Sequence, residues 1–497
     1  MLRRWLVWLC AGVCLLPASA HAQQQAFALP PADWYAVVWD AGEDTLNWVS
    51  AAGTVATIQR PILPDEVFGG DPRMSLSADG RYMVLVSDLA DGRQGIGFYD
   101  FAAGEFTQVH RTEAGERVAR YSAADGRGDQ VALGFATIGT GAWRIISFDY
   151  ATGDAQSILS HDSPIAAAIP AQTAAERPAP RQPFVLLFDA ARGVIHFHLT
   201  ADERSAPDTA FAWYPDDGVL EPSPLADISA DFSPRDGEPL FTFNNRTLPA
   251  VTGGANAVGR GDAINPQMIY GDGETAKTAV RWLAGGDWVG FLARGDDRAN
   301  WQIIRVDEPP IRPQAVLSSA VLDLAGTPDG FLAVRDDGTI HAVSNLAAPQ
   351  GTPVYRPPLP DVVRAVPPQI IGVSVSPTLQ QVRVPVVAPL IAVIPPCPGT
   401  PAHRVSIGER VQVIGEAPLR VRATAGGVQI DEMAVGVTGE IRRGASCVNG
   451  YLWWLVRWTK PDGSLVEGWS AEGDLDEYYM MPIAEDVPPA VESAPEE

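Results

Sequence analysis

The sequence has few basic residues for its length. Its 497 residues contain 36 lysines and arginines against 60 aspartates and glutamates, which gives a formal net charge of −24. A protein that binds nucleic acid needs a basic face, so this balance argues against that class of partner, and anionic lipid surfaces are disfavoured for the same reason. Hydrophobic residues at 46% and charged residues at 19% exclude a disordered chain, and the length indicates two or three domains.

Motifs that carry catalytic or metal chemistry are also missing. The chain has no HExxH, no GxSxG and no phosphate-binding glycine loop. His196 and His198 form the one close histidine pair, and a third ligand such as Asp189 would have to come from elsewhere, so we expect no metal site. We therefore predict a protein that is not an enzyme and that needs no cofactor.

Long apolar runs are absent after the first sixteen residues. Near the start, two arginines precede twelve apolar residues at 5–16, and the small residues Ala20 and Ala22 follow. This pattern is typical of a secretory signal peptide, here residues 1–22. The alternative is a membrane anchor, but twelve residues are too few to span a bilayer, which needs about 20. We therefore expect an extracytoplasmic protein (secreted, periplasmic or on the cell surface) that does not span a membrane.

Cysteine is scarce, and signal-peptide cleavage makes it scarcer. Of the four cysteines, Cys10 and Cys14 lie within the signal peptide, which leaves Cys397 and Cys447 in an oxidising compartment. We predict that these two form a disulfide. It would tie the end of a proline-rich segment to the turn before a tryptophan-rich strand.

Residues 23–347 contain a loose repeat of turn, apolar run, turn and apolar run. Its turn glycines are Gly80, Gly126, Gly237, Gly286 and Gly330. The steps between them are 46, 111, 49 and 44 residues, and one unmarked repeat with strands near 184–189 and 194–199 fits the long step. A repeat of this length predicts a β-propeller of about seven blades, so the fold class is all-β. The SxDG-type turns resemble those of degenerate WD-repeat-like propellers of secreted bacterial proteins. The alternative is a pair of β-sandwiches.

Residues 349–398 hold 13 prolines and almost no charge. Such a run cannot form a helix or a central strand, so we expect a proline-rich linker at 348–396 that separates two domains. The alternative is that the segment lies along the propeller, because 370–375 and 382–387 are apolar enough to pair as edge strands. The last residues, 486–497, are acidic and proline-rich and predict a disordered tail.

The region 397–485 carries the most specific pattern. Residues 418–427 read PLRVRATAGG, 449–458 read NGYLWWLVRW, and 467–472 read EGWSAE. In this order and spacing they resemble the LNVRxxPG, GxxWWxV and GWVxE elements of bacterial Src-homology-3 (SH3) domains. The resemblance implies a small SH3-like β-barrel after the propeller. Arg420 replaces the usual asparagine, and the usual proline near Ala425 is absent.

The tryptophan-rich strand predicts aromatic side chains on both of its faces. Alternation places Leu452, Trp454, Val456 and Trp458 on one face and Tyr451, Trp453 and Leu455 on the other. A small barrel buries only one face, so some aromatic rings stay near the surface, where they can stack on a sugar or a peptide. We expect Trp454 and Trp469 in the core.

We predict ligand contact for Trp453, Tyr478, Tyr479 and Arg422. The local positive charge comes from Arg420, Arg422, Arg442, Arg443 and Arg457.

Two function classes fit the sequence. The first is a non-catalytic extracytoplasmic binding or scaffold protein, in which the propeller is an interaction platform and the SH3-like module is an anchor for cell-wall glycan, peptidoglycan or another envelope protein. The alternative is a secreted propeller enzyme, a glycan lyase or hydrolase, with the small domain as its anchor. An enzyme needs titratable groups that converge at the propeller mouth, and sequence alone does not place the blade loops.

Overall fold

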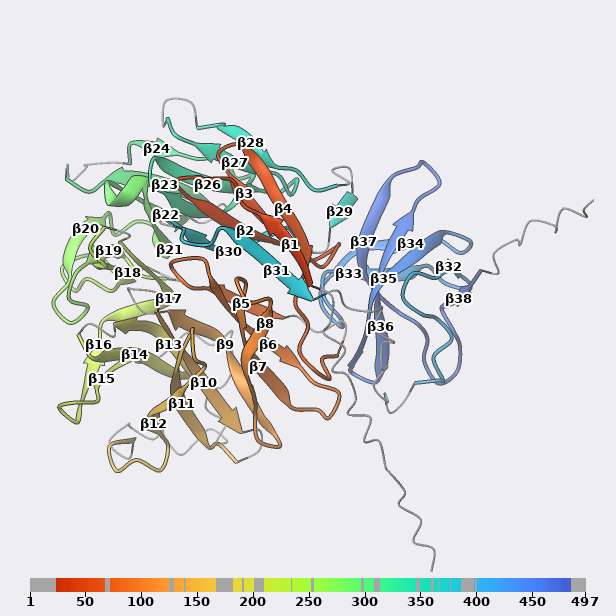
Figure 1. Cartoon of the computed structure of the whole chain (residues 1–497), viewed down its shortest axis with the longest axis horizontal. Coiled ribbons are helices and arrows are strands. Elements are labelled where there is room, and N and C mark those ends of the chain that lie inside the picture. Colours follow the sequence, from red (N-terminus) through yellow and green to blue (C-terminus); the bar gives the residue numbers. More distant parts are fainter. Residues whose placement is uncertain are drawn as a thin grey trace, which may run out of the picture.

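A computed structural model gives the architecture of the chain (Figure 1). It describes residues 24–67, 72–124, 129–137, 140–166, 182–189, 192–200, 210–233, 235–251, 254–295, 299–307, 313–345, 349–358, 362–364, 366–375, 377–385, 397 and 400–483. The predicted signal peptide at 1–22 and tail at 486–497 lie outside these residues. Among the described residues, none of the helices has the length and apolar character needed to span a bilayer.

Seven four-stranded antiparallel sheets form a seven-bladed β-propeller, as the repeat predicted. Blade 1 consists of β30 (Gln369–Ser374), β2 (Tyr35–Asp40), β3 (Thr45–Ser50) and β4 (Gly53–Gln59). Blade 2 consists of β5 (Arg73–Leu76), β6 (Tyr82–Asp88), β7 (Gln94–Asp100) and β8 (Glu105–Arg111). Blade 3 consists of β9 (Glu116–Ala124), β10 (Gln130–Thr137), β11 (Trp143–Asp149) and β12 (Ala155–Ser160). Blades 4 and 5 consist of β13 (Gln182–Asp189), β14 (Val194–Thr200), β15 (Ala210–Tyr214) and β16 (Val219–Ser223); and β17 (Leu225–Phe232), β18 (Pro239–Phe243), β19 (Ala257–Arg260) and β20 (Gln267–Gly271). Blades 6 and 7 consist of β21 (Ala276–Leu283), β22 (Trp288–Arg294), β23 (Ala299–Arg305) and β24 (Ala315–Val316); and β25 (Val321–Thr327), β26 (Gly330–Arg335), β27 (Ile340–Val343) and β28 (Thr352–Tyr355), with a 3-10 turn, η2 (Ala284–Gly286), before β22.

The SxDG turn places a glycine where the backbone needs a positive φ. Gly80, in the turn between β5 and β6, has φ +76°, a conformation that glycine adopts without steric cost. The Ser77 hydroxyl donates to the Asp79 carboxylate at 2.6 Å, and the same carboxylate accepts from the Arg81 amide at 3.0 Å. These local hydrogen bonds stabilise the turn between β5 and β6.

The ring is closed by a strand from the proline-rich segment. β30 pairs with β2, more than 300 residues earlier in the chain, and as the innermost strand of blade 1 it contacts β25 and β5 of the neighbouring blades. β28, which also lies beyond residue 347, is the fourth strand of blade 7. The expected linker at 348–396 is therefore wrong for these stretches, and the alternative of strands along the propeller describes them. β30 itself contains no proline and is mainly apolar, so its backbone is able to pair with β2.

A second pair of strands fastens the same segment to the propeller. β31 (Gln381–Pro385) pairs with β1 (Gln24–Ala28), and the Arg383 amide donates to the Phe101 carbonyl at 2.8 Å. Val382 and Val384 are buried in the cluster that joins blades 1 and 2, together with Trp48 and Phe101. The chain that enters the propeller and the chain that leaves it therefore lie side by side.

The C-terminal strands form a separate sheet beside blade 1, coloured blue in Figure 1. Its order is β34 (Gln429–Met433), β33 (Leu419–Arg422), β37 (Leu465–Ala471), β36 (Tyr451–Thr459), β35 (Thr438–Val448), β32 (Arg410–Val413) and β38 (Met480–Pro482), and β29 (Val362–Arg364) adds to β37 in parallel. We call residues 397–483 the C-terminal unit. The predicted alternation along β36 is confirmed, because Trp454 and Trp458 are fully buried in the main core and Trp453 belongs to a second cluster with Trp469.

The predicted disulfide is confirmed. Cys397 and Cys447 are joined with their Cα atoms 5.4 Å apart, and the bond closes a sequence separation of 50 residues. Cys447 lies near the end of β35, just before the turn into β36. The bond thus fixes the start of the C-terminal unit to this hairpin.

The two units are held together by charged side chains. Glu43, in the turn between β2 and β3, accepts from Arg442 at 2.7 Å and from Arg457 at 2.6 Å, and all three are largely buried. The Arg443 guanidinium lies over the Trp39 ring at 5.7 Å. Two arginines that the sequence offered as charge for ligand binding, Arg442 and Arg457, are therefore engaged by the propeller. The two units are therefore in direct contact through these side chains.

Candidate functional site

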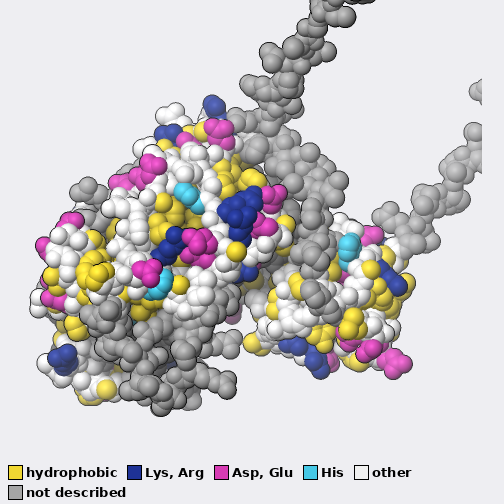
Figure 2. All heavy atoms as spheres, turned by 90° about the horizontal axis from the view of Figure 1, so that it is seen from below, with side chains coloured by type: hydrophobic (Ala, Val, Ile, Leu, Met, Phe, Trp, Pro, Cys, Tyr) yellow, Lys and Arg dark blue, Asp and Glu magenta, His cyan; other side chains and the backbone are white. Residues whose placement is uncertain are grey.

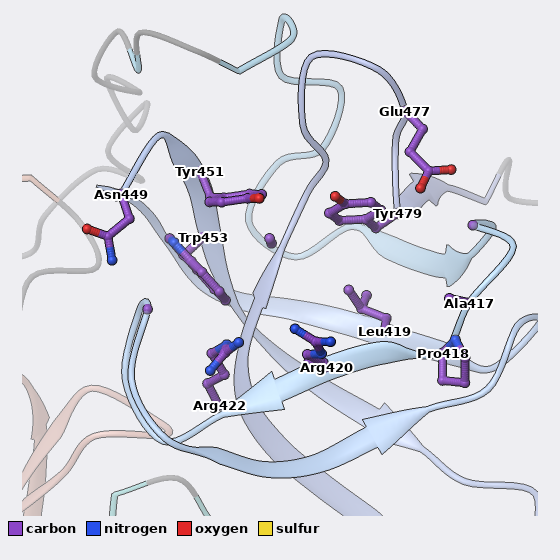
Figure 3. Close-up of a pocket in the computed structure, with 13 residues that line it drawn as sticks. Ala417, Pro418, Leu419, Arg420, Arg422, Asn449, Tyr451, Trp453, Glu477 and Tyr479 are labelled. Carbon is purple, nitrogen blue, oxygen red and sulfur yellow. The ribbon is translucent and has the colours of Figure 1, made fainter.

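The C-terminal unit contains a groove of about 410 Å³ between β33, β36 and the chain that leads into β38 (Figure 3). Its walls combine three aromatic rings, two arginines and one carboxylate. The residues that line it are Gly415, Ala417, Pro418, Leu419, Arg420, Arg422, Gly426, Asn449, Tyr451, Trp453, Ala471, Glu477 and Tyr479.

One wall is the start of β36 and the turn before it. Asn449 has φ +54° and is followed by Gly450 at +77°, so the Asn-Gly pair makes the tight hairpin turn that links β35 to β36. The Trp453 indole nitrogen donates to the Val448 carbonyl at 3.1 Å, which fixes the ring against this turn. Tyr451 lies on the same face, with its ring centroid 6.0 Å from that of Trp453.

The opposite wall carries Tyr479. Its hydroxyl donates to the Asp474 carboxylate at 2.5 Å, and its amide donates to the Glu472 carbonyl at 2.8 Å. Burial, and then the hydrogen bond to Asp474, raise the pKa of the phenol above its usual range, so this hydroxyl stays protonated. In Figure 3 the rings of Tyr451 and Tyr479 lie on opposite sides of the groove.

The floor is formed by β33, with the arginine side chains reaching into the groove (Figure 3). The Arg422 guanidinium lies over the Trp453 ring at 5.6 Å and donates through one terminal nitrogen to the Gly427 carbonyl at 2.6 Å. Arg420 is exposed, and Glu477 is exposed at the rim. The charges of the lining residues are therefore two positive and one negative.

Of the four residues expected to contact a ligand, Trp453, Tyr479 and Arg422 line one groove, and Tyr478 does not. The Tyr478 hydroxyl donates to the Ala402 carbonyl at 2.7 Å, and the Arg404 guanidinium stacks on its ring at 3.8 Å. The Tyr478 side chain therefore packs within the C-terminal unit and outside the groove. Trp453 is more enclosed than expected, at 6% exposed.

Sequence reasoning missed Tyr451, Arg420 and Asn449 as groove residues. The alternation had already placed Tyr451 on the face of Trp453. Arg420 and Asn449 gave no such signal, because the meeting of β33 with the β35–β36 turn depends on the sheet order and not on local pattern.

The tryptophans that we expected in the core are there. Trp454 is fully buried, and its indole nitrogen donates to the Glu472 carboxylate at 2.8 Å. Burial raises the pKa of Glu472, which also accepts from the Arg404 amide. Trp469 is 6% exposed and packs with Trp453.

The histidine pair on β14 is structural. His196 and His198 are buried, and burial lowers the pKa of each to about 4. His196 is hydrogen-bonded to the Ser223 hydroxyl at 2.9 Å, and the His198 ring lies 5.2 Å from that of Phe184. In the part of the chain that the structure describes, no group of three side chains is placed to hold a metal ion.

The propeller surface shows no segregation of charge on the face in Figure 2, where acidic and basic side chains lie next to one another. Ion pairs of the propeller include Arg81 with Asp100 at 2.7 Å and Arg144 with Glu116 at 2.8 Å.

No protein-family model matches the chain, and no curated protein matches it. Solved structures that it resembles include TolB from Acinetobacter baumannii, with 14% identity over 57% of this chain and 66% of that one at a TM-score of 0.32. The β-propeller domain of Cps50 (Swd1) from Myceliophteria thermophila matches with 11% identity over 62% of this chain and 94% of that one at a TM-score of 0.36. No function or partner follows from similarities of this size. The chain is a seven-bladed propeller protein because of its own strand order, and this does not depend on the comparisons.

Proposed function

We propose that this is a non-catalytic extracytoplasmic binding protein whose C-terminal unit is a bacterial SH3-like module that binds cell-wall peptidoglycan. The propeller is its rigid platform for other envelope proteins. The observation that carries the proposal is the groove, in which Tyr451, Trp453 and Tyr479 surround a space next to two arginines.

The chemistry of the groove supports this ligand. Its volume of about 410 Å³ lies within the range of about 300–1,000 Å³ of ligand pockets. Aromatic rings pack against the apolar faces of sugars and against peptide side chains, and the phenol and amide groups supply polar contacts. Peptidoglycan offers both parts, a glycan and a short peptide.

The compartment fits the same proposal. A disulfide persists in oxidising environments, and the arrangement of basic, apolar and small residues at 1–22 is that of an export signal. We prefer binding to the enzyme alternative because the groove is a built aromatic cavity, whereas the close histidine pair of the propeller, His196 and His198, is buried and neutral.

Sedimentation with insoluble peptidoglycan tests the proposal. The mature chain, residues 23–497, should co-sediment, and Tyr451→Ala should weaken binding about tenfold because a stacking face is lost. Tyr478→Ala is the matched control, since that ring adjoins Tyr479 in sequence but lies outside the groove. Each variant is first checked for an unchanged melting profile.

The proposal fails if the folded wild-type chain stays in the supernatant. It also fails if Tyr451→Ala binds as well as the control variant does.

A further inference from the structure

The two groove arginines have no carboxylate partner among the residues that the structure describes. Elsewhere in the chain, Arg60, Arg144 and Arg457 each form an ion pair at 2.6–2.8 Å. Among the described residues, neither Arg420 nor Arg422 forms an ion pair within the chain.

The hydrogen bonds of Arg422 leave donor capacity in the groove. A guanidinium has five N–H donors, and here one terminal nitrogen donates to the Gly427 carbonyl at 2.6 Å. The Nε nitrogen is buried, so a ligand in the groove would meet the terminal nitrogens. The side chain is half-buried against Trp453, which holds the planar group in place. A held guanidinium with unused donors suits an oxygen anion from outside the chain.

Arg420 adds a second guanidinium from the same strand. It is exposed, two residues from Arg422 on β33, and it lines the same groove. The only carboxylate among the lining residues is that of Glu477, which comes from the other side of the groove in Figure 3. The lining is thus net positive by one charge in a chain of net charge −24.

From these contacts we infer that the groove recognises a free carboxylate on its ligand, bound by Arg420 and Arg422, while Tyr451, Trp453 and Tyr479 pack against the atoms next to it. This inference rests on the proposed function and specifies it. In peptidoglycan, N-acetylated sugars are neutral and the free carboxylates lie on the stem peptide. The groove therefore recognises the stem peptide, and the sugar rings contribute less to binding.

Calorimetric titration of the mature chain with two soluble disaccharide–peptide fragments tests the inference. One fragment has free stem-peptide carboxylates, and the other has the same carboxylates amidated. The free form should bind roughly tenfold more tightly, because hydrogen bonds between charged groups are the stronger kind. Its affinity should fall as salt is raised from 50 to 500 mM, and that of the amidated form should not change.

Arg420→Gln should remove this preference, and the exposed side chain makes the variant safe for folding. Arg410→Gln is the matched control, because it removes the same charge from an exposed position on β32 outside the groove. Equal affinity for both fragments in the wild type overturns the inference. So does unchanged preference in Arg420→Gln. If both fragments bind equally and Tyr451→Ala abolishes binding, the proposed function stands without the carboxylate. If neither fragment nor insoluble peptidoglycan binds, both proposals are overturned.

Discussion

Replacing Cys447 by serine should lower the free energy of unfolding of the C-terminal unit by about 4 kcal/mol. The bond closes a sequence separation of 50 residues. On the chain-entropy relation, a loop of that length removes about 14 cal/mol/K from the unfolded chain, which is about 4 kcal/mol at 25 °C. For a unit of this size, each kcal/mol corresponds to about 4–8 °C, so the melting temperature of a separate transition should fall by roughly 15–30 °C.

Urea denaturation followed by tryptophan fluorescence measures this loss. Of the 12 tryptophans in residues 23–497, four (Trp453, Trp454, Trp458 and Trp469) lie in the C-terminal unit and eight in the propeller, so the loss is read from the part of the fluorescence transition that reductant shifts. Cys397→Ser should give the same loss, and the double variant should be no worse than either single variant, because all three remove one bond. Reductant should shift the wild type to the variant midpoint and leave the double variant unchanged. A wild-type midpoint that is the same with and without reductant would refute the reasoning.

Three further changes test other parts of the structure. A chain of residues 23–358 lacks β30 and should fail to fold, whereas 23–385 should show a cooperative melting transition; a soluble, cooperatively folded 23–358 would contradict the closure of blade 1. Glu43→Gln should cost about 1–2 kcal/mol and make the junction between the units more sensitive to protease, because two partly buried ion pairs lose their shared carboxylate; unchanged proteolysis would show that these pairs do not hold the units together. Burial holds the pKa of His198 at about 4, against about 6.5 when unfolded, so the unfolded state takes up the proton first and stability should fall as the pH drops from about 6.5 to 4. His198→Phe should flatten that decline in melting temperature, and an equally steep decline in the variant would count against the assignment.

The propeller could be predicted from sequence because turn glycines recur at similar spacing, from Gly80 to Gly330, in five of its seven blades. The Ser-x-Asp-Gly turn at Gly80 forms through hydrogen bonds within five residues, so its signal is complete in the sequence itself. The closing strand has no such signal. β30 comes from a region whose prolines predict a spacer, and its partner β2 lies far away in the chain. Long-range pairing of that kind depends on the completed ring.

In the candidate site, too, the residues governed by a local pattern could be predicted and the others could not. Alternation along β36 correctly separated Trp454 in the core from Trp453 on the other face, since it depends only on the pleat. No such pattern separated Tyr478 from Tyr479, and the Tyr478 ring stacks with Arg404 and does not line the groove. Neighbouring residues at an irregular chain end do not follow strand alternation, so their directions could not be predicted.

A crystal structure of the mature chain with a disaccharide–peptide fragment of peptidoglycan tests the central claim most directly. We predict that the fragment lies in the groove of the C-terminal unit, against Tyr451 and Trp453, with a stem-peptide carboxylate within hydrogen-bond distance of both Arg420 and Arg422. A fragment bound on the propeller, with the groove empty, would contradict the account.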